Sequence, residues 1–213
     1  MGQNNSIVKS FIFFLAIFFA IATHSHAQTD TDSTKFYLSI ETDPAFWVGT
    51  LPKGVGFDAN INFRLAKLPR LRLGILGYTG RWSGNFGKTV LLTEDFKEDN
   101  WETQWNGLGI EAQYQFRVGL ARGGLQGGLR AQWNQFLYYQ NDIQKGKANH
   151  FVLTPQVGFQ WFPFKKLGLY LLPWAGVQIP VAGTDKILIN NELCETRKLM
   201  PVVTGHIGWE FRF

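Results

Sequence analysis

Residues Met200–Phe213 read MPVVTGHIGWEFRF, and this stretch decides the fold. One set of alternate positions carries glycine and apolar side chains: Val203, Gly205, Ile207, Trp209, Phe211 and Phe213. The other set includes the polar residues Thr204, His206, Glu210 and Arg212. A period of two predicts a β-strand whose side chains point to opposite faces in turn. A strand that closes a barrel in a membrane has lipid to cover its aromatic face, so we expect this strand to lie in a bilayer.

The same alternation recurs in seven earlier segments. It is clearest in Val55–Leu65, where every second residue from Val55 is apolar. The seven segments are Phe36–Val48, Val55–Leu65, Leu71–Trp82, Leu108–Val118, Leu125–Tyr138, Phe151–Trp161 and Leu169–Val181. Together with Met200–Phe213 they predict an all-β fold, an eight-stranded antiparallel up-and-down transmembrane β-barrel.

The connections between these segments alternate in length. The second, fourth and sixth are tight turns, whereas residues 83–104, 140–149 and 183–199 form long polar stretches. Tight turns at one end and long loops at the other are typical of outer-membrane barrels. We therefore expect the three long stretches to be loops facing the cell exterior.

Most charged residues of the predicted strands fall on the less apolar face. Side chains fill the interior of an eight-stranded barrel, so mixed charges there predict a buried network of ion pairs. The residues expected in this network are Glu41, Asp58, Arg64, Arg72, Glu111, Arg117, Arg130, Glu210 and Arg212.

Aromatic residues gather near the ends of the predicted strands, which suggests girdles at two membrane surfaces. On the loop side these are Trp47, Trp82, Trp105, Tyr138 and Phe151; on the turn side they are Phe36, Phe63, Phe116, Trp161, Phe211 and Phe213. Four prolines inside predicted strands each remove a ladder donor, so we expect bulges or strand ends at Pro44, Pro155, Pro173 and Pro180.

The N-terminus has the order of a secretory signal. Lys9 precedes an unbroken apolar run, Phe11–Ala22, which is too short to span a bilayer, and Ser25-His26-Ala27 fits a cleavage site. Residues 1–27 are therefore expected to be a signal peptide and residues 28–213 the barrel domain. The single cysteine, Cys194, excludes an internal disulfide and is expected to be a loop thiol.

The terminal Trp209-Glu210-Phe211-Arg212-Phe213 resembles the C-terminal signal of Gram-negative outer-membrane β-barrels. The whole pattern is similar to the compact eight-stranded members of that group, such as the membrane domain of outer-membrane protein A. The resemblance implies localisation in the outer membrane and an assembly signal, formed by Trp209, Phe211 and Phe213, that the barrel-assembly machinery reads. It also implies periplasmic chaperones, outer-membrane lipid and lipopolysaccharide as partners, and a monomeric state.

The sequence offers little catalytic chemistry. No basic run suggests nucleic-acid binding, and no residue spacing suggests a metal or cofactor site. His206 and Glu210 could support general-base chemistry if a nucleophile lay within reach, although an interior hydrogen-bonding role for His206 is the simpler interpretation. We expect a non-enzymatic outer-membrane protein with a structural, adhesion or binding role through its extracellular loops. The alternatives are a narrow channel or small-ligand transporter, and an enzyme that modifies lipid A.

Overall fold

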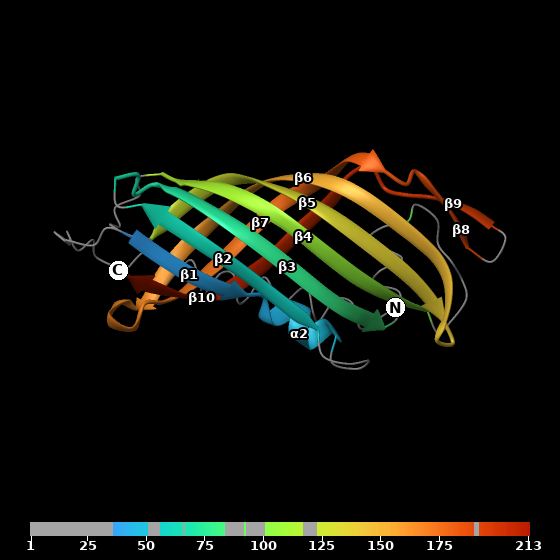
Figure 1. The fold of residues 1–213 in the computed structure, drawn as a ribbon, viewed down its shortest axis with the longest axis horizontal. Helices are drawn as coiled ribbons and strands as arrows, with labels where there is room; N and C mark the ends of the chain where they lie inside the picture. Colours follow the sequence, from blue (N-terminus) through green and yellow to red (C-terminus); the bar gives the residue numbers. More distant parts are fainter. Residues whose placement is uncertain are drawn as a thin grey trace, which may run out of the picture.

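The protein folds into one closed barrel, seen in a computed structural model that describes residues 36–50, 56–65, 67–83, 92, 101–116, 123–189 and 192–213. Each strand pairs antiparallel with its neighbour, and the last strand closes on the first (Figure 1). The eight barrel strands are β1 Phe36–Thr42, β2 Phe57–Leu65, β3 Leu71–Ser83, β4 Trp101–Gln115, β5 Gly124–Gln140, β6 Ile143–Phe164, β7 Leu169–Gly183 and β10 Met200–Arg212. The eight-stranded up-and-down barrel predicted from the alternation is confirmed. The predicted signal peptide, residues 1–27, lies outside the described residues.

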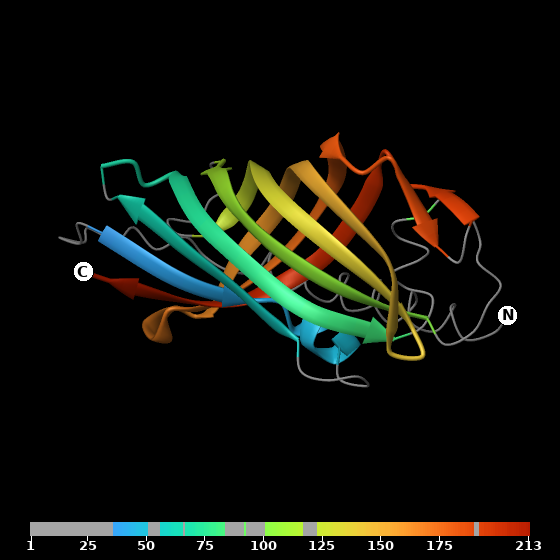
Figure 2. The ribbon, with the colours of Figure 1, turned by 45° about the vertical axis from the view of Figure 1, so that its right-hand side comes forward.

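Three short elements complete the described chain: helix α2 (Pro44–Thr50), the 3₁₀ turn η2 (Lys165–Leu167) and a hairpin of β8 (Lys186–Ile189) and β9 (Glu192–Glu195). The hairpin lies at the end of the barrel away from the C-terminus (Figure 2). Within the described residues, no helix has the length and apolar character needed to cross a membrane.

The first predicted strand, Phe36–Val48, was too long. β1 ends at Thr42, and the chain turns into α2 at Pro44. Asp43 caps the helix because its Oδ1 accepts hydrogen bonds from the backbone N–H groups of Ala45 (2.8 Å) and Phe46 (3.3 Å). Proline suits the first position of a helix, where its missing N–H costs nothing. Pro44 therefore starts a helix and does not interrupt a strand.

Two of the three expected outer loops contain regular structure. In place of a loop over residues 140–149, β5 and β6 run on to a two-residue turn at Asn141-Asp142, whose φ angles of 49° and 61° suit a tight hairpin. Residues 183–199 include the β8–β9 hairpin, which buries Cys194 on β9. The third expected loop, residues 83–104, is shortened because β4 begins at Trp101. Of its remaining residues, 84–91 and 93–100 lie outside the described residues.

The prolines of β6 and β7 behave differently from one another. A bulge accompanies Pro180, where the register of the two strands shifts between Phe151 and Val152. Pro155 and Pro173 lie within strands whose register is unchanged from Leu153↔Ile179 to Trp161↔Leu171, so the bulges expected there were wrong.

The two faces of the wall differ in polarity as the alternation predicts. Over most of the barrel, apolar side chains point outward and are exposed; examples from six strands are Ile40, Ile61, Ile75, Ile110, Leu129 and Val203. The interior positions between them are buried and mainly polar, and include Asn60, Arg72, Glu111, Gln132, Thr154 and Gln160.

Candidate functional site

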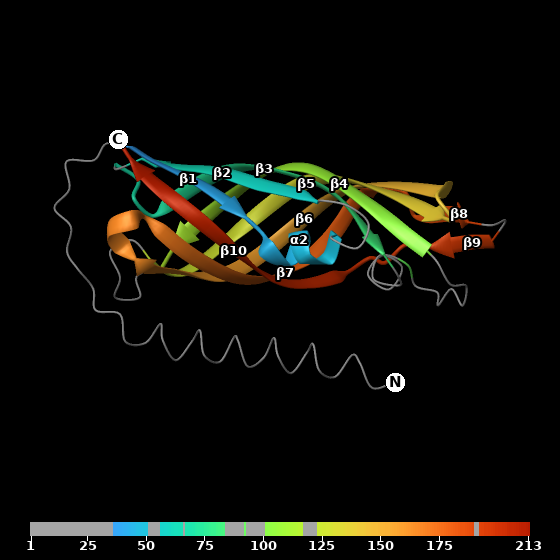
Figure 3. The same cartoon turned by 90° about the horizontal axis from the view of Figure 1, so that it is seen from below.

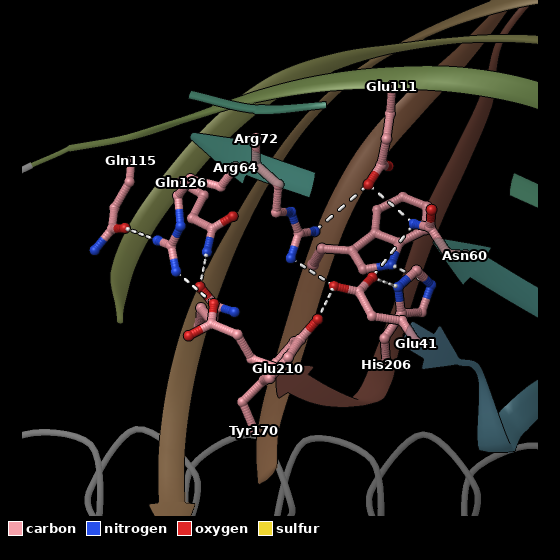
Figure 4. Close-up of polar contacts among 12 residues, drawn as sticks. Glu41, Asn60, Arg64, Arg72, Glu111, Gln115, Gln126, Tyr170, His206 and Glu210 are labelled. Carbon is pink, nitrogen blue, oxygen red and sulfur yellow. Dashed lines mark hydrogen bonds and ion pairs between the residues drawn. The ribbon is translucent and has the colours of Figure 1, made fainter. Parts of the chain in front are cut away.

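The centre of the barrel holds a cluster of charged side chains from four strands. Arg72 on β3 bridges two carboxylates: its Nη1 lies 2.5 Å from Glu41 Oε1 and its Nη2 lies 3.4 Å from Glu111 Oε1 (Figure 4). Arg130 on β5 donates to Glu111 Oε2 from Nε (3.2 Å) and Nη2 (3.0 Å). Asn60 on β2 donates to Glu111 (2.9 Å) and Glu41 (3.3 Å). Two carboxylates and two guanidinium groups therefore balance each other in charge, which is the condition for burying such groups.

His206 on β10 is part of the same cluster and has both ring nitrogens engaged. Trp174 Nε1 lies 3.1 Å from His206 Nε2, and an indole N–H can only donate, so Nε2 accepts. Nδ1 then carries the proton and donates to Glu41 Oε2 at 2.9 Å. Tyr170 OH donates to the other oxygen of Glu41 at 2.5 Å. These partners assign a neutral His206 with no ring nitrogen left to act as a base.

A second layer lies nearer the tight-turn end. Arg64 on β2 forms an ion pair with Glu210 on β10 and donates to Gln115 Oε1 at 3.3 Å. Beside it, Gln126 Nε2 donates to Gln160 Oε1 at 2.7 Å. This layer pairs one cation with one anion, so, like the central cluster, it is balanced in charge.

Three of the nine expected network residues are not placed in it. Asp58 is half-buried, and its Oδ1 accepts a hydrogen bond from the backbone N–H of Asp43 at 2.8 Å, so it supports the start of α2. Arg117 lies outside the described residues, and the side chain of Arg212 is likewise not described. The other six occupy the two layers above: Glu41, Arg64, Arg72, Glu111, Arg130 and Glu210.

The outer half of the interior is aromatic. Phe46 of α2 is buried, and its ring centroid lies 5.4 Å from that of Trp82, 5.8 Å from Tyr78 and 6.5 Å from Trp105. We call Tyr78, Trp82 and Trp105 the aromatic cage. Trp82, Trp105 and the fully buried Tyr138 had been expected in the loop-side girdle on the outer surface, and that expectation was wrong. On the turn side, Phe63, Phe116, Phe211 and Phe213 are exposed as expected, whereas Phe36 and Trp161 are half-buried.

Beyond the cage, the barrel has an apolar core of the kind found in soluble proteins. Buried side chains of four barrel strands meet Leu92 and the inner face of the β8–β9 hairpin in one cluster, which we call the head core. Its members are Leu92, Trp101, Phe136, Tyr138, Ala148, Ile187, Ile189, Cys194 and Met200.

Toward the loop end, where the interior becomes apolar, the outer surface becomes polar. A hydrogen-bonded row of polar side chains crosses β3 to β6 and ends at Thr184, just beyond β7. Thr79 Oγ1 donates to Asn106 (2.7 Å), Asn106 Nδ2 to Gln135 (3.4 Å) and Gln135 Nε2 to Asn149 (3.2 Å), while Asn149 N–H donates to Thr184 Oγ1 (3.1 Å). We call this row the amide belt.

Above the belt, the outward side chains include several charged groups beside the exposed Ile143. Arg81 pairs with Glu102 (2.5 Å) and Asp142 (2.8 Å), and its guanidinium lies 4.3 Å from the ring centroid of Tyr139. Lys145 and Lys147 are exposed on β6. The wall thus has apolar groups outside and charges inside below the belt, and charges outside and an apolar core inside above it.

The described residues show little catalytic or metal-binding potential. No group of three or more His, Cys, Asp or Glu side chains among them could hold a metal ion. The alternation placed the charged members of the interior, but it did not indicate the roles of Asn60, Tyr170 and Trp174. The only sequence signal for these three residues was that they occupy alternate strand positions expected to face the interior.

No protein-family model matches the chain, and no curated protein matches it in sequence. Among solved structures, the chain is similar to Neisserial surface protein A, with a TM-score of 0.47, 12% identity, and 83% of this chain and 97% of that chain covered. It is also similar to a major outer membrane protein from Thermus thermophilus (TM-score 0.48, 12% identity, 84% and 100% covered). A third likeness is to CarO of Acinetobacter baumannii (TM-score 0.38, 13% identity, 87% and 100% covered). The barrel architecture of this chain rests on its own strand pairing.

Proposed function

We propose that this protein is a non-enzymatic, non-conducting barrel of the bacterial outer membrane that acts through the head it presents outside the cell. The head comprises the strand extensions above the amide belt and the β8–β9 hairpin. The observation that carries the proposal is the exchange of polarity between the two faces of the wall at the belt. Only a chain surrounded by hydrocarbon below that level and by water above it gains from this arrangement.

The height of the apolar outer surface supports a bilayer. On β6 it extends from Phe151 to Trp161, ten residues further along the chain. At ~3.3 Å per residue and a strand tilt of about 40°, ten residues rise about 25 Å along the barrel axis. Outer-membrane barrels present an apolar band of about 25 Å.

The filled interior argues against the channel alternative. The central cluster, the aromatic cage and the head core follow one another along the axis, and their members are largely buried. Ions crossing such an interior would have to separate the Arg72–Glu41 and Arg130–Glu111 pairs, which is costly in a low-dielectric setting. The paired nitrogens of His206 argue in the same way against lipid A chemistry at that residue.

The placement can be tested by labelling with a membrane-impermeant maleimide. Lys145 is exposed in the head and Lys166 is exposed on η2 at the tight-turn end, so the variants Lys145→Cys and Lys166→Cys differ only in which end they report. We expect intact cells to be labelled at position 145 alone, and lysed cells at both. Labelling of position 166 in intact cells would overturn the orientation. Single-channel steps from the purified protein in planar bilayers would overturn the non-conducting assignment.

We also propose that the last strand is read by the assembly machinery and that lipid and lipopolysaccharide surround the monomer. Trp209, Phe211 and Phe213 point outward and are exposed, so they are accessible on the last strand. The variant Phe213→Ala should reduce the amount of folded protein in the outer membrane while refolding in detergent stays unchanged. Equal losses in both settings would indicate a role in folding alone.

A further inference from the structure

The barrel wall is incomplete beside α2. Pairing between β1 and β10 ends at Thr42↔Ile207, whereas β10 continues to Met200 and is paired there with β7 only. On the other side, β2 begins at Phe57 opposite Thr79, and β3 continues to Ser83 paired with β4 only. We call this interval between the upper parts of β10 and β3 the seam. Within the described residues, α2 fills the seam and no strand does (Figure 3).

The seam borders the apolar outer surface on its β2 and β10 sides, while its β3 edge, residues 80–83, begins just above the amide belt. Phe57 and Val203, which flank it on β2 and β10, are exposed on the outer wall. On α2 itself, Trp47 and Val48 are exposed. In a bilayer, the medium next to this helix is therefore the acyl chains of the surrounding lipid.

Among the described residues, few hydrogen bonds hold α2 in the wall. At its start, Thr204 Oγ1 donates to Asp43 Oδ2 (2.6 Å) and the Asp43 N–H donates to Asp58 (2.8 Å). At its end, the Gly56 N–H donates to Thr50 Oγ1 (2.8 Å). A strand in the same position would be held by a ladder of backbone bonds on both edges. Moving α2 thus breaks no strand ladder and leaves the barrel closed below.

Behind the helix lies an apolar space that is occupied by one phenyl ring. Phe46 points from α2 into the aromatic cage, and two glycines make room for the helix. A Cβ at Gly80 would lie 2.6 Å from Thr50 Cγ2 and 2.7 Å from Phe46 Cε1, and a Cβ at Gly56 would clash with Thr50 Oγ1. The cage can therefore hold an apolar group about the width of a phenyl ring, delivered through the wall.

We propose that the seam is a binding site for one acyl chain of a bilayer lipid, which enters sideways and replaces Phe46 in the aromatic cage. The proposal rests on the bilayer placement argued above. An acyl chain fits the chemistry because the cage is apolar, the opening faces hydrocarbon, and the exchange trades one buried apolar group for another. Because Trp82 lies three residues beyond Thr79 of the amide belt on β3, the lipid head group would lie above the belt, beside the charged outer face of the head.

Quenching by lipids with brominated acyl chains tests the proposal, because bromine quenches the fluorescence of an indole it contacts. Three variants would each keep one tryptophan and carry phenylalanine at the other seven positions: Trp82 in the cage, Trp174 in the interior behind β7, and Trp209 on the lipid-facing wall. In brominated phosphatidylcholine vesicles we expect Trp209 and Trp82 to lose most of their fluorescence and Trp174 to keep it. Adding Phe46→Ala should increase the quenching of Trp82.

The outcomes separate this inference from the proposed function. Quenching of Trp209 without quenching of Trp82 would overturn the seam site and leave the barrel in the membrane, whereas absence of quenching at Trp209 would overturn both. Quenching of Trp82 only by a brominated free fatty acid in unbrominated vesicles would overturn bilayer lipid as the source. If the single-tryptophan variants do not fold, the unaltered protein can be photolabelled with a diazirine-bearing phospholipid. Adducts on Phe46 or Trp82 then support the site, and adducts confined to the outer wall refute it.

Discussion

Replacing Glu111 with glutamine tests whether the interior is held by paired charges. The carboxylate is buried and receives hydrogen bonds from four side chains: Arg130, Arg72, Asn60 and Gln156. Glutamine has the same shape but carries an NH₂ group in place of one carboxylate oxygen. Since both oxygens of Glu111 accept hydrogen bonds, the NH₂ group faces other donors in either orientation of the amide. It also leaves the two guanidinium groups with one carboxylate in place of two.

The expected loss follows from the burial of these groups. Removing one partner of a buried ion pair strands the other charge and costs about 3–5 kcal/mol. A matched control is Asp142→Asn, because the side chain of Asp142 is 80% exposed and also pairs with an arginine, Arg81. An exposed pair of this kind contributes about 0–1 kcal/mol, and asparagine tolerates the positive φ of this position.

The measurement is a urea titration of each variant refolded in detergent micelles, followed by tryptophan fluorescence and by heat-modifiable gel mobility. We expect the midpoint to fall for Glu111→Gln at an unchanged slope, which reports a loss of stability without a change in the surface exposed on unfolding. The double variant Glu111→Gln, Arg130→Gln should recover part of the loss, because it restores electrical neutrality. Equal midpoints for Glu111→Gln and Asp142→Asn, or purely additive losses in the double variant, would refute the account.

Three further variants test other parts of the fold. Gly80→Val should displace α2 at a cost of about 1–3 kcal/mol from overpacking and expose the seam to protease. The control is Gly77→Ala, because a Cβ at Gly77 would have its nearest neighbour at 3.8 Å. This control should change neither the urea midpoint nor the digestion pattern. Leu129→Arg should cost about 2–4 kcal/mol of stability in lipid vesicles, against about 0–1 for Gln135→Arg on the same face of β5; equal costs would place the membrane boundary elsewhere. Asn141→Val should lower the free energy of unfolding by about 1–2 kcal/mol because a β-branched residue must adopt the left-handed conformation at φ 49°, and asparagine-to-glycine at the same site should not lower it.

The sequence predicted the barrel because its main signal, a period of two, is set locally by the strand itself. The predicted faces were correct wherever the wall has apolar groups outside, as at Ile61, Ile75 and Ile110. The first strand was misjudged at Asp43-Pro44, where a helix cap and a favourable first helical residue override an alternation that continues through Val48.

The errors over residues 140–149 and in the loop-side aromatic girdle have one common physical cause. Above the amide belt the strands still alternate, but in the proposed placement water covers the outer face there; Lys145 and Lys147 point outward and Ala148 points inward. A stretch with lysines and few large apolar residues resembles a loop, which is why residues 140–149 were expected to be one. The same exchange placed Trp105 and Tyr138 inside, although a membrane girdle would have put them outside.

The sequence could not predict the charge pairs that join strands distant in the chain. Glu111 and Arg130 lie opposite each other on the consecutive strands β4 and β5. By contrast, Glu41 contacts Arg72 and His206, and Glu111 contacts Asn60, on strands that do not follow one another in the chain. Which side chains meet across a barrel depends on the stagger between strands all the way round, and no single segment encodes that quantity. The alternation of inward and outward positions predicted which residues lie inside. The closed barrel then determines which of them meet.

The exchange of polarity also explains how the chain fixes its register. In an ordinary sheet, a slip by one residue moves one apolar face into water. In β5 and β6 the same slip would put Arg130 and its neighbours into lipid below the belt and the aromatic side chains Phe136 and Tyr138 into water above it. A one-residue slip causes both misplacements at once, and each is costly. Long strands that cross the belt are therefore held in register by two separate constraints, one on each side of the belt. Shorter strands such as β1 cross no belt and lack this second constraint, and it is beside β1 that the wall is completed by a helix.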